Sequence, residues 1–170
     1  MVKSYVVDAF ANEIFKGNPA AVLFVDEFPS DQLMQNIAME NKLYETAFAI
    51  KRDDNHYDLR WFSPAGEIDL CGHATLATGF LVYQQAAPKD GGPVVFKTQS
   101  GDLTVTKKDN LYEMDFPTYE MKAVPVTEAM TEAYGLRPEA AYLGRDLLCV
   151  FPQGTDVAGM DPDMEKLKKL

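Results

Sequence analysis

Between residues 69 and 83 the chain reads Asp69-Leu70-Cys71-Gly72-His73-Ala74-Thr75-Leu76-Ala77-Thr78-Gly79-Phe80-Leu81-Val82-Tyr83. From Ala74 to Tyr83 almost every residue is apolar or small, and no polar face recurs at helical spacing. A helix that is apolar all round belongs in the interior of a fold, so the rest of the chain must wrap it. The unpaired N–H groups of its first turn form a natural anion site, and a thiol and an imidazole lie beside them.

Length and composition indicate a soluble globular protein. The 170 residues suit one domain or slightly more, and 46% are hydrophobic. The net charge of -10 and the absence of a basic run argue against binding to nucleic acid or to an anionic membrane. A small anionic substrate is still compatible, because local N–H groups would hold it. With no signal peptide and no run of about 20 apolar residues, we expect a cytoplasmic protein with Cys71 and Cys149 reduced.

Before the central helix the pattern predicts strands at 3–10 and 21–25, joined by a loop over 12–20 rich in turn residues. Ser30 is the expected N-cap of a helix that runs to about Asn41, with apolar residues at positions 33, 34, 37 and 38. Two further strands are expected at 44–50 and 57–62. These elements should surround the apolar helix.

The strand at 44–50 places Glu45 between small residues. A period of two puts Glu45, Ala47 and Ala49 on one face and residues 44, 46, 48 and 50 on the other. The small neighbours leave room beside the carboxylate for a packed element or a ligand. The alternative is an edge position where Glu45 reaches water, which the residues taken alone favour.

After the helix, a loop at 88–92 precedes three short strands at 94–98, 103–107 and 111–116, which predict an antiparallel meander. A linker at 117–125, a helix at 126–134, a strand at 142–151 and a helix from Asp161 should follow. We therefore expect an α+β fold with an antiparallel sheet curled around a central helix over residues 1–117. Residues 118–170 are expected to be a linker and the incomplete start of a second unit of a longer chain.

Two titratable residues at the front of the central helix suggest chemistry. Cys71 and His73 are too few and too close in sequence for a zinc site, so no metal is expected. A thiolate at a helix N-terminus has a lowered pKa and could abstract a proton, but an inert core thiol is equally compatible with the pattern. His73 could bind an anion or exchange protons, or its ring could simply bond a nearby carbonyl.

Four segments, taken together and in this order, resemble the phenazine-biosynthesis PhzF family of isomerases. They are Phe15-Lys16-Gly17-Asn18-Pro19-Ala20-Ala21-Val22, Tyr44-Glu45-Thr46-Ala47-Phe48, Leu59-Arg60-Trp61-Phe62-Ser63-Pro64 and Glu67-Ile68-Asp69-Leu70-Cys71-Gly72-His73-Ala74-Thr75-Leu76-Ala77. Each segment alone is a modest signal. The resemblance covers about the first 120 residues well and the remainder more loosely.

The resemblance implies the diaminopimelate-epimerase-like fold, with two similar halves and the active site between them. It also implies that Glu45 is the catalytic acid/base and that His73 positions substrate and relays protons. Gly72, Ala74 and Asn18 are expected to bind a small carboxylate-bearing substrate, while Cys71 matches a catalytic cysteine of related epimerases. Burial in a closed cleft would raise the pKa of Glu45, as such chemistry near pH 7 requires. No cofactor is implied.

In members of this family the second half of the protein carries a G-S-A-H-type motif, which is absent before Leu170. Half of the cleft is therefore expected to be missing, and the chain should form a homodimer or pack against that second half. Three hypotheses remain open. The first is a PhzF-like isomerase that works by acid/base proton transfer, the second a cysteine-dependent amino-acid racemase or epimerase, and the third a truncated, non-catalytic dimerisation module.

Overall fold

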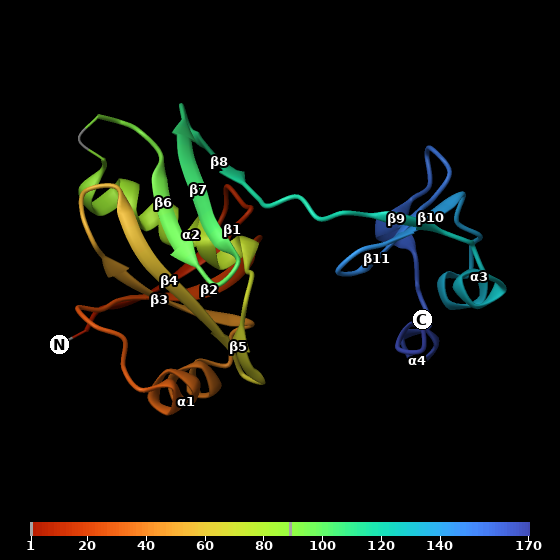
Figure 1. The fold of residues 1–170 in the computed structure, drawn as a ribbon, viewed down its shortest axis with the longest axis horizontal. Helices are drawn as coiled ribbons and strands as arrows, with labels where there is room; N and C mark the ends of the chain where they lie inside the picture. Colours follow the sequence, from red (N-terminus) through yellow and green to blue (C-terminus); the bar gives the residue numbers. More distant parts are fainter. Residues whose placement is uncertain (1, 89) are drawn as a thin grey trace. The chain divides into compact units, whose positions relative to one another are not determined.

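The computed structural model describes residues 2–88 and 90–170, and the chain forms two compact units, Met1–Pro117 and Thr118–Leu170 (Figure 1). Lys89, within the loop predicted at 88–92, lies outside the described residues. The two units are treated separately below. That the second unit is the start of a similar half stays a prediction.

One sheet of eight strands forms the first unit. Its strand order is β1-β2-β3-β4-β6-β7-β8, and β5 pairs with β4. The strands are β1 (Ser4–Ala9), β2 (Asn18–Phe24), β3 (Glu45–Lys51), β4 (His56–Ser63), β5 (Gly66–Ile68), β6 (Val94–Thr98), β7 (Gly101–Lys108) and β8 (Leu111–Asp115). The predicted meander of β6, β7 and β8 is confirmed.

The pairing of these strands corrects two expectations. The sheet is mixed rather than wholly antiparallel, because β2 pairs with β3 in parallel and β4 pairs with β6 in parallel. Both parallel pairs are joined by a helical crossover, which parallel neighbours require. The predicted loop at 12–20 is also too long, since Asn18 already pairs with Ala9 as the first residue of β2.

Helix α2 (Gly72–Ala86) fills the interior of the first unit, as its apolar sequence predicts (Figure 1). It packs against β1, β2 and β3 at one end of the sheet order and against β6, β7 and β8 at the other, so the sheet curls around it. Ala74, Ala77 and Val82 are buried in this core. Close approach to β7 requires a glycine at position 79, where a Cβ would lie 2.7 Å from Val105 Cγ1.

Helix α1 (Asp31–Asn41) covers the opposite face of β3 and β4. The predicted N-cap is confirmed, because the Ser30 hydroxyl accepts a hydrogen bond from the Leu33 N–H. Met34 and Ala38 are buried against Phe48 and Phe62, forming a second apolar cluster.

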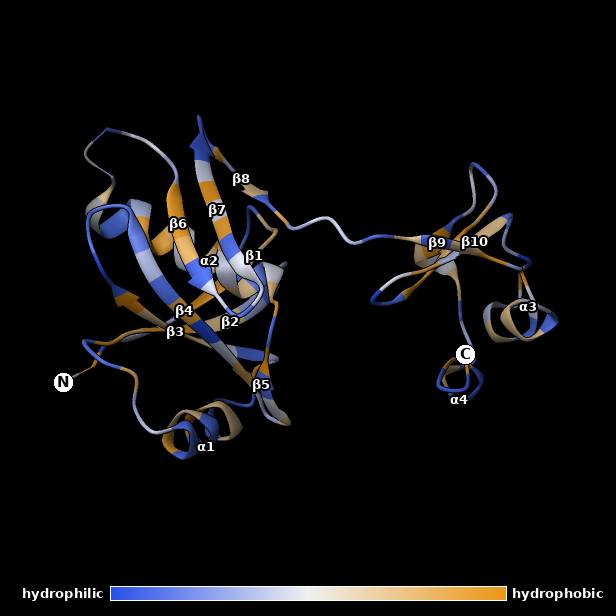
Figure 2. Cartoon of the chain, viewed as in Figure 1, coloured by the Kyte–Doolittle hydropathy of each residue, from blue (hydrophilic) through white to orange (hydrophobic). Residues whose placement is uncertain are grey.

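Along β7, hydrophobic and hydrophilic residues alternate as expected of a strand with one buried face (Figure 2).

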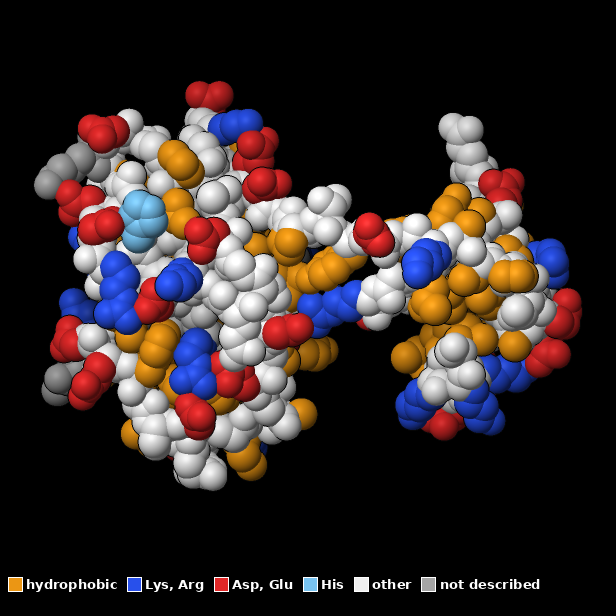
Figure 3. Space-filling model, in the orientation of Figure 1, with side chains coloured by type: hydrophobic (Ala, Val, Ile, Leu, Met, Phe, Trp, Pro, Cys, Tyr) orange, Lys and Arg blue, Asp and Glu red, His pale blue; other side chains and the backbone are white. Residues whose placement is uncertain are grey.

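The second unit is a three-stranded sheet with short helices. The order is β11-β10-β9. Its elements are β9 (Lys122–Val124), α3 (Glu128–Tyr134), β10 (Ala140–Leu143), β11 (Leu147–Val150), η1 (Val157–Gly159) and α4 (Met164–Leu167). Few of its side chains are fully buried, and hydrophobic side chains gather on the face seen in Figure 3.

Three predictions for this unit need correction. The strand predicted at 142–151 is a hairpin, because Gly144-Arg145-Asp146 forms a turn between β10 and β11. The predicted linker at 117–125 contains β9, which pairs with β10. The last helix begins at Met164, since the side chain of Asp163 caps the N–H groups of Glu165 and Lys166.

Among the described residues, 2–88 and 90–170, no helix combines the length and the apolar character needed to cross a membrane. The longest described helix, α2, has 15 residues, fewer than the roughly 20 that a bilayer requires.

Candidate active site

Glu45 begins β3 on the face that packs against α2. Its neighbours at alternate positions, Ala47 and Ala49, are fully buried in the same core as α2. The register pairs Glu45 with Ala20 of β2, so the carboxylate lies within the sheet and not at its edge. The predicted two-face pattern of this strand is thus confirmed, and the alternative of a water-exposed edge is wrong because only 18% of the side chain is exposed.

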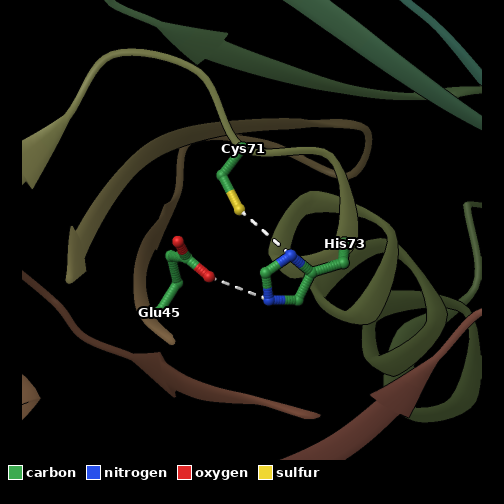
Figure 4. Close-up of side chains that lie close together, drawn as sticks. All are labelled: Glu45, Cys71 and His73. Carbon is green, nitrogen blue, oxygen red and sulfur yellow. Dashed lines mark hydrogen bonds and ion pairs between the residues drawn. The ribbon is translucent and has the colours of Figure 1, made fainter. Parts of the chain in front are cut away.

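His73 and Cys71 approach Glu45 from the front of α2. Cys71 is the N-cap and His73 is the second residue of the helix. The Nε2 atom of His73 lies 3.0 Å from Oε2 of Glu45, and its Nδ1 atom lies 3.6 Å from Sγ of Cys71. Figure 4 shows the carboxylate and the sulfur both pointing toward the imidazole ring. Glu45 therefore forms one cluster with two residues that follow it 26 and 28 positions later in the sequence.

The contact between Glu45 and His73 is closed to solvent but not fully satisfied. Glu45 Oε2 and His73 Nε2 are both buried atoms without a hydrogen bond of normal geometry among the described residues, although they are 3.0 Å apart. Desolvation raises the pKa of Glu45 and lowers the pKa of His73. Burial thus favours the neutral form of each group. Both buried atoms still lack a hydrogen-bond partner of normal geometry, and buried polar atoms generally have one.

The Cys71 thiol differs from the expectation for a cysteine at a helix N-terminus. Burial raises its pKa to about 12. The N–H groups of Ala74 and His73 act against this effect, without making a capping hydrogen bond, and the charge of Glu45 adds to it. Of the two alternatives for Cys71, the buried core thiol is confirmed and the low-pKa thiolate is not, because removing the thiolate from water outweighs the favourable helix end.

The other predicted site residues lie close to this cluster. Gly72 and Ala74 flank His73 in the first turn of α2, where backbone N–H groups have no partner within the helix. A side chain at Gly72 would collide with Phe116, whose ring lies 2.9 Å from the ideal Cβ position. Asn18, two residues before Ala20 on β2, shares the face of Glu45 but has no described contact with it.

Sequence reasoning missed two residues that support the site. The hydroxyl of Thr75 donates a 2.6 Å hydrogen bond to the carbonyl of Cys71 and so fixes the first turn of α2. Trp61 pairs with Ala47 across β3 and β4, and its buried Nε1 atom has no hydrogen-bond partner among the described residues. The four-residue spacing of Cys71 and Thr75 could have indicated the first contact.

The fold also supplies a third potential metal donor that sequence spacing could not reveal. Donor atoms of Glu45, Cys71 and His73 all lie within 4.8 Å of one another.

Two hollows of the first unit, of about 430 and 880 Å³, are lined by other residues. The larger one lies over Leu76 and Phe80 of α2, between β1 and the β7–β8 turn.

Comparison with known proteins identifies the family of the chain. The family model described as phenazine biosynthesis-like protein (PhzC-PhzF) matches residues 7–170. An uncharacterised isomerase of Pseudomonas aeruginosa is 41% identical over 167 residues, which cover 98% of this chain and 63% of the relative. The chain therefore spans less than two thirds of the length of this relative.

Solved structures show the same fold. A PhzF-family protein of Enterococcus faecalis superposes with a TM-score of 0.88 at 47% identity, covering 98% of this chain and 64% of the other. A predicted epimerase of Pseudomonas aeruginosa, at 20% identity, shares the fold with a TM-score of 0.73, covering 98% of this chain and 66% of the other. The chain belongs to the PhzC-PhzF family of phenazine biosynthesis-like proteins.

Proposed function

We propose that this chain carries the acid/base half of an isomerase that moves a proton on a small, carboxylate-bearing substrate. Similar proteins are named isomerases, which supports this reaction class. The residues proposed to act are Glu45 and His73. No cofactor enters the proposed reaction. Proton transfer between two carbons needs only a base that removes a proton from one carbon and then donates a proton to the other.

The observation that carries this proposal is the buried contact of 3.0 Å between Glu45 Oε2 and His73 Nε2. In the proposed reaction the Glu45 carboxylate removes a proton from one substrate carbon and becomes a carboxyl group. It then returns a proton to another position, and His73 can exchange that proton at Nε2. The raised pKa of Glu45 moves this group toward neutral pH, where acid/base catalysis is most effective. The lowered pKa of His73 favours the uncharged imidazole, which can accept or donate a proton.

The front of α2 is proposed to hold the carboxylate of the substrate. The N–H groups near Gly72 and Ala74 point out of the first helical turn, and the positive end of the helix dipole favours an anion there. Asn18, on the same sheet face as Glu45, is proposed as a further substrate contact. Because the chain spans only part of its relatives, this proposal concerns the full-length protein.

Solvent-deuterium exchange tests the assignment of Glu45. In the full-length protein, Glu45→Gln should abolish deuterium incorporation into substrate while circular dichroism shows an intact fold, because the amide cannot accept the proton. The matched control is Glu40→Gln, since Glu40 is exposed on α1 and should leave exchange unchanged. Unchanged exchange in Glu45→Gln would contradict the proposal.

The same assay separates the cysteine-dependent epimerase from the proposed reaction. A pKa of about 12 leaves Cys71 as a thiol, so it is a poor base near neutral pH. We expect Cys71→Ser to retain at least a substantial part of the exchange rate. Complete loss of exchange in Cys71→Ser, with Glu45→Gln still active, would favour the epimerase instead.

A further inference from the structure

The imidazole ring of His73 lies between two different side chains, one at each ring nitrogen. Oε2 of Glu45 is 3.0 Å from Nε2, and Sγ of Cys71 is 3.6 Å from Nδ1. Figure 4 shows the carboxylate and the sulfur at these two separate positions of the ring. We propose that Cys71 is a positioning residue, whose S–H group donates a hydrogen bond to Nδ1 and so keeps the hydrogen of the neutral ring on Nε2, facing Glu45.

The contact with Glu45 decides which ring nitrogen carries the hydrogen. A carboxylate can only accept hydrogen bonds, and a ring nitrogen without a hydrogen can also only accept. Two acceptor atoms that are 3.0 Å apart and both shielded from solvent would repel each other. While Glu45 is ionised, as the base of the proposed reaction must be, the hydrogen of the ring therefore belongs on Nε2.

The Nδ1 atom of His73 is then an acceptor, because a neutral imidazole carries a hydrogen on one nitrogen only. The donor on that side is the thiol of Cys71. Burial raises the pKa of this thiol to about 12, which keeps the hydrogen on the sulfur near neutral pH. A thiol is a weak donor, and a separation of 3.6 Å suits a hydrogen bond that includes the large sulfur atom.

Packing and a backbone contact hold the thiol beside the ring. Cys71 is the N-cap of α2, and its side chain belongs to the same buried core as Ala47 and Ala74. The hydroxyl of Thr75 donates a 2.6 Å hydrogen bond to the carbonyl of Cys71 and fixes this residue against the first turn of the helix. Because only 5% of Cys71 is exposed, the sulfur is held at Nδ1 and away from solvent.

This arrangement gives Cys71 a role that is neither nucleophile nor base. A hydrogen bond to Nδ1 stabilises the neutral ring and restricts proton exchange to Nε2, beside Glu45. The effect on the reaction rests on the proposed function, whereas the state of the ring does not. The same arrangement explains why Cys71→Ser should retain exchange, because a serine hydroxyl can also donate a hydrogen bond to Nδ1.

The first test reads both ring nitrogens of His73 by ¹⁵N NMR near neutral pH. The chain has two histidines, so His56→Gln leaves His73 as its single imidazole. A ring nitrogen that carries a hydrogen and one that does not give widely separated signals. We expect the hydrogen on Nε2 and none on Nδ1. A ring with its hydrogen on Nδ1 would overturn the proposal, and this measurement needs no substitution at Cys71.

The second test uses the direction of a change in the pKa of His73. Removing a donor frees Nδ1 to take a proton, so Cys71→Ala should raise this pKa by about 0.5–1 unit, the equivalent of one hydrogen bond. If the sulfur instead accepts a hydrogen bond from Nδ1–H, Cys71→Ala should lower the pKa or leave it unchanged, and either result would overturn the proposal.

Two further variants complete the NMR test. Cys71→Ser should keep the hydrogen on Nε2, and its transfer to Nδ1 would contradict the role of Cys71 as a donor. Cys149, the other free cysteine, lies in the second unit, so Cys149→Ala is the matched control and should leave the pKa of His73 unchanged. A rise in Cys149→Ala equal to that in Cys71→Ala would also overturn the proposal.

The pH dependence of deuterium exchange separates this proposal from the proposed function. In full-length Cys71→Ala, the low-pH limit of exchange should move upward together with the pKa of His73. If the pKa rises while the limit of exchange stays in place, Cys71 controls the state of the ring but His73 takes no part in proton transfer. That outcome supports the role of Cys71 and contradicts the role of His73 in the proposed function.

Discussion

Strand β3 has two faces that are almost equally closed to solvent but carry different kinds of residue. Toward α2 it presents Glu45 followed by Ala47 and Ala49, and both alanines are fully buried. Toward α1 it presents Phe48 and Ile50, with exposed fractions of 0% and 4%. The Phe48 ring packs edge-on against Phe62 at a centroid distance of 5.8 Å.

The difference shows that one strand can divide stability and chemistry between its faces. Large side chains toward α1 fill space and bury apolar area. Small side chains toward α2 let the helix approach the sheet closely, and this brings His73 to within 3.0 Å of Glu45. Substitutions on the two faces should therefore have separable effects on stability and on exchange.

The largest effect on stability should come from the α1 face. Phe48→Ala removes a fully buried ring and leaves a cavity, so the free energy of unfolding should fall by about 3–5 kcal/mol, measured by urea denaturation. Tyr44→Ala, at the 73% exposed residue just before β3, should change it by less than about 0.5 kcal/mol.

Exchange measured on the folded fraction of full-length Phe48→Ala should remain close to that of the unchanged protein. A large loss of exchange at full folding would mean that the two faces are not separable. A loss of stability no larger than that of Tyr44→Ala would mean that Phe48 does not anchor α1.

A smaller effect on stability, with a larger effect on exchange, is expected on the α2 face. Ala47→Leu forces extra volume between β3 and α2 and should cost about 1–3 kcal/mol. It should slow exchange about 100-fold, because a displacement of about 1 Å at Glu45 misplaces the carboxyl group.

The matched control is Ala123→Leu, an exposed strand position on β9, which should alter neither quantity measurably. Unchanged exchange in Ala47→Leu would show that the spacing between β3 and α2 does not control the site.

Much of the first unit was predictable because its signals are periodic. The apolar run after Cys71 predicts α2, and the alternation after Tyr44 correctly assigns Glu45 to the face with Ala47 and Ala49. Ser30 marks the start of α1 through its own hydrogen bond. These are local rules, and residues within a few positions of one another satisfy them.

The remainder depends on contacts between distant residues. Nothing near Glu45 in sequence indicates that Ala20 pairs with it in parallel, or that His73 lies 3.0 Å away. The two alternatives for Cys71 could not be separated because a helix end is visible in the sequence and the depth of burial is not. In the second unit, short strands such as β9 and β10 are too brief for their period to separate them from turns.

The two buried groups should also affect stability in opposite directions as pH changes. His73 has a lowered pKa in the folded chain, so its stabilising effect is present above about 6.5 and is lost as the pH falls through its folded pKa. Glu45 has a raised pKa in the folded chain, so its stabilising contribution to the free energy of unfolding is present below about pH 4.5 and is lost as the pH rises through its folded pKa.

The most direct test of the central claim, that β3 and α2 enclose a desolvated acid/base pair, is an NMR titration of both side chains. It follows the ring signals of His73 and the carboxyl carbon of Glu45 in the folded chain, with His56→Gln and Glu45→Gln to assign the signals and the urea-unfolded chain as reference. The account predicts a His73 pKa below 6.5 and a Glu45 pKa above 4.5. Folded-state pKa values equal to those of the unfolded chain for both groups would contradict it.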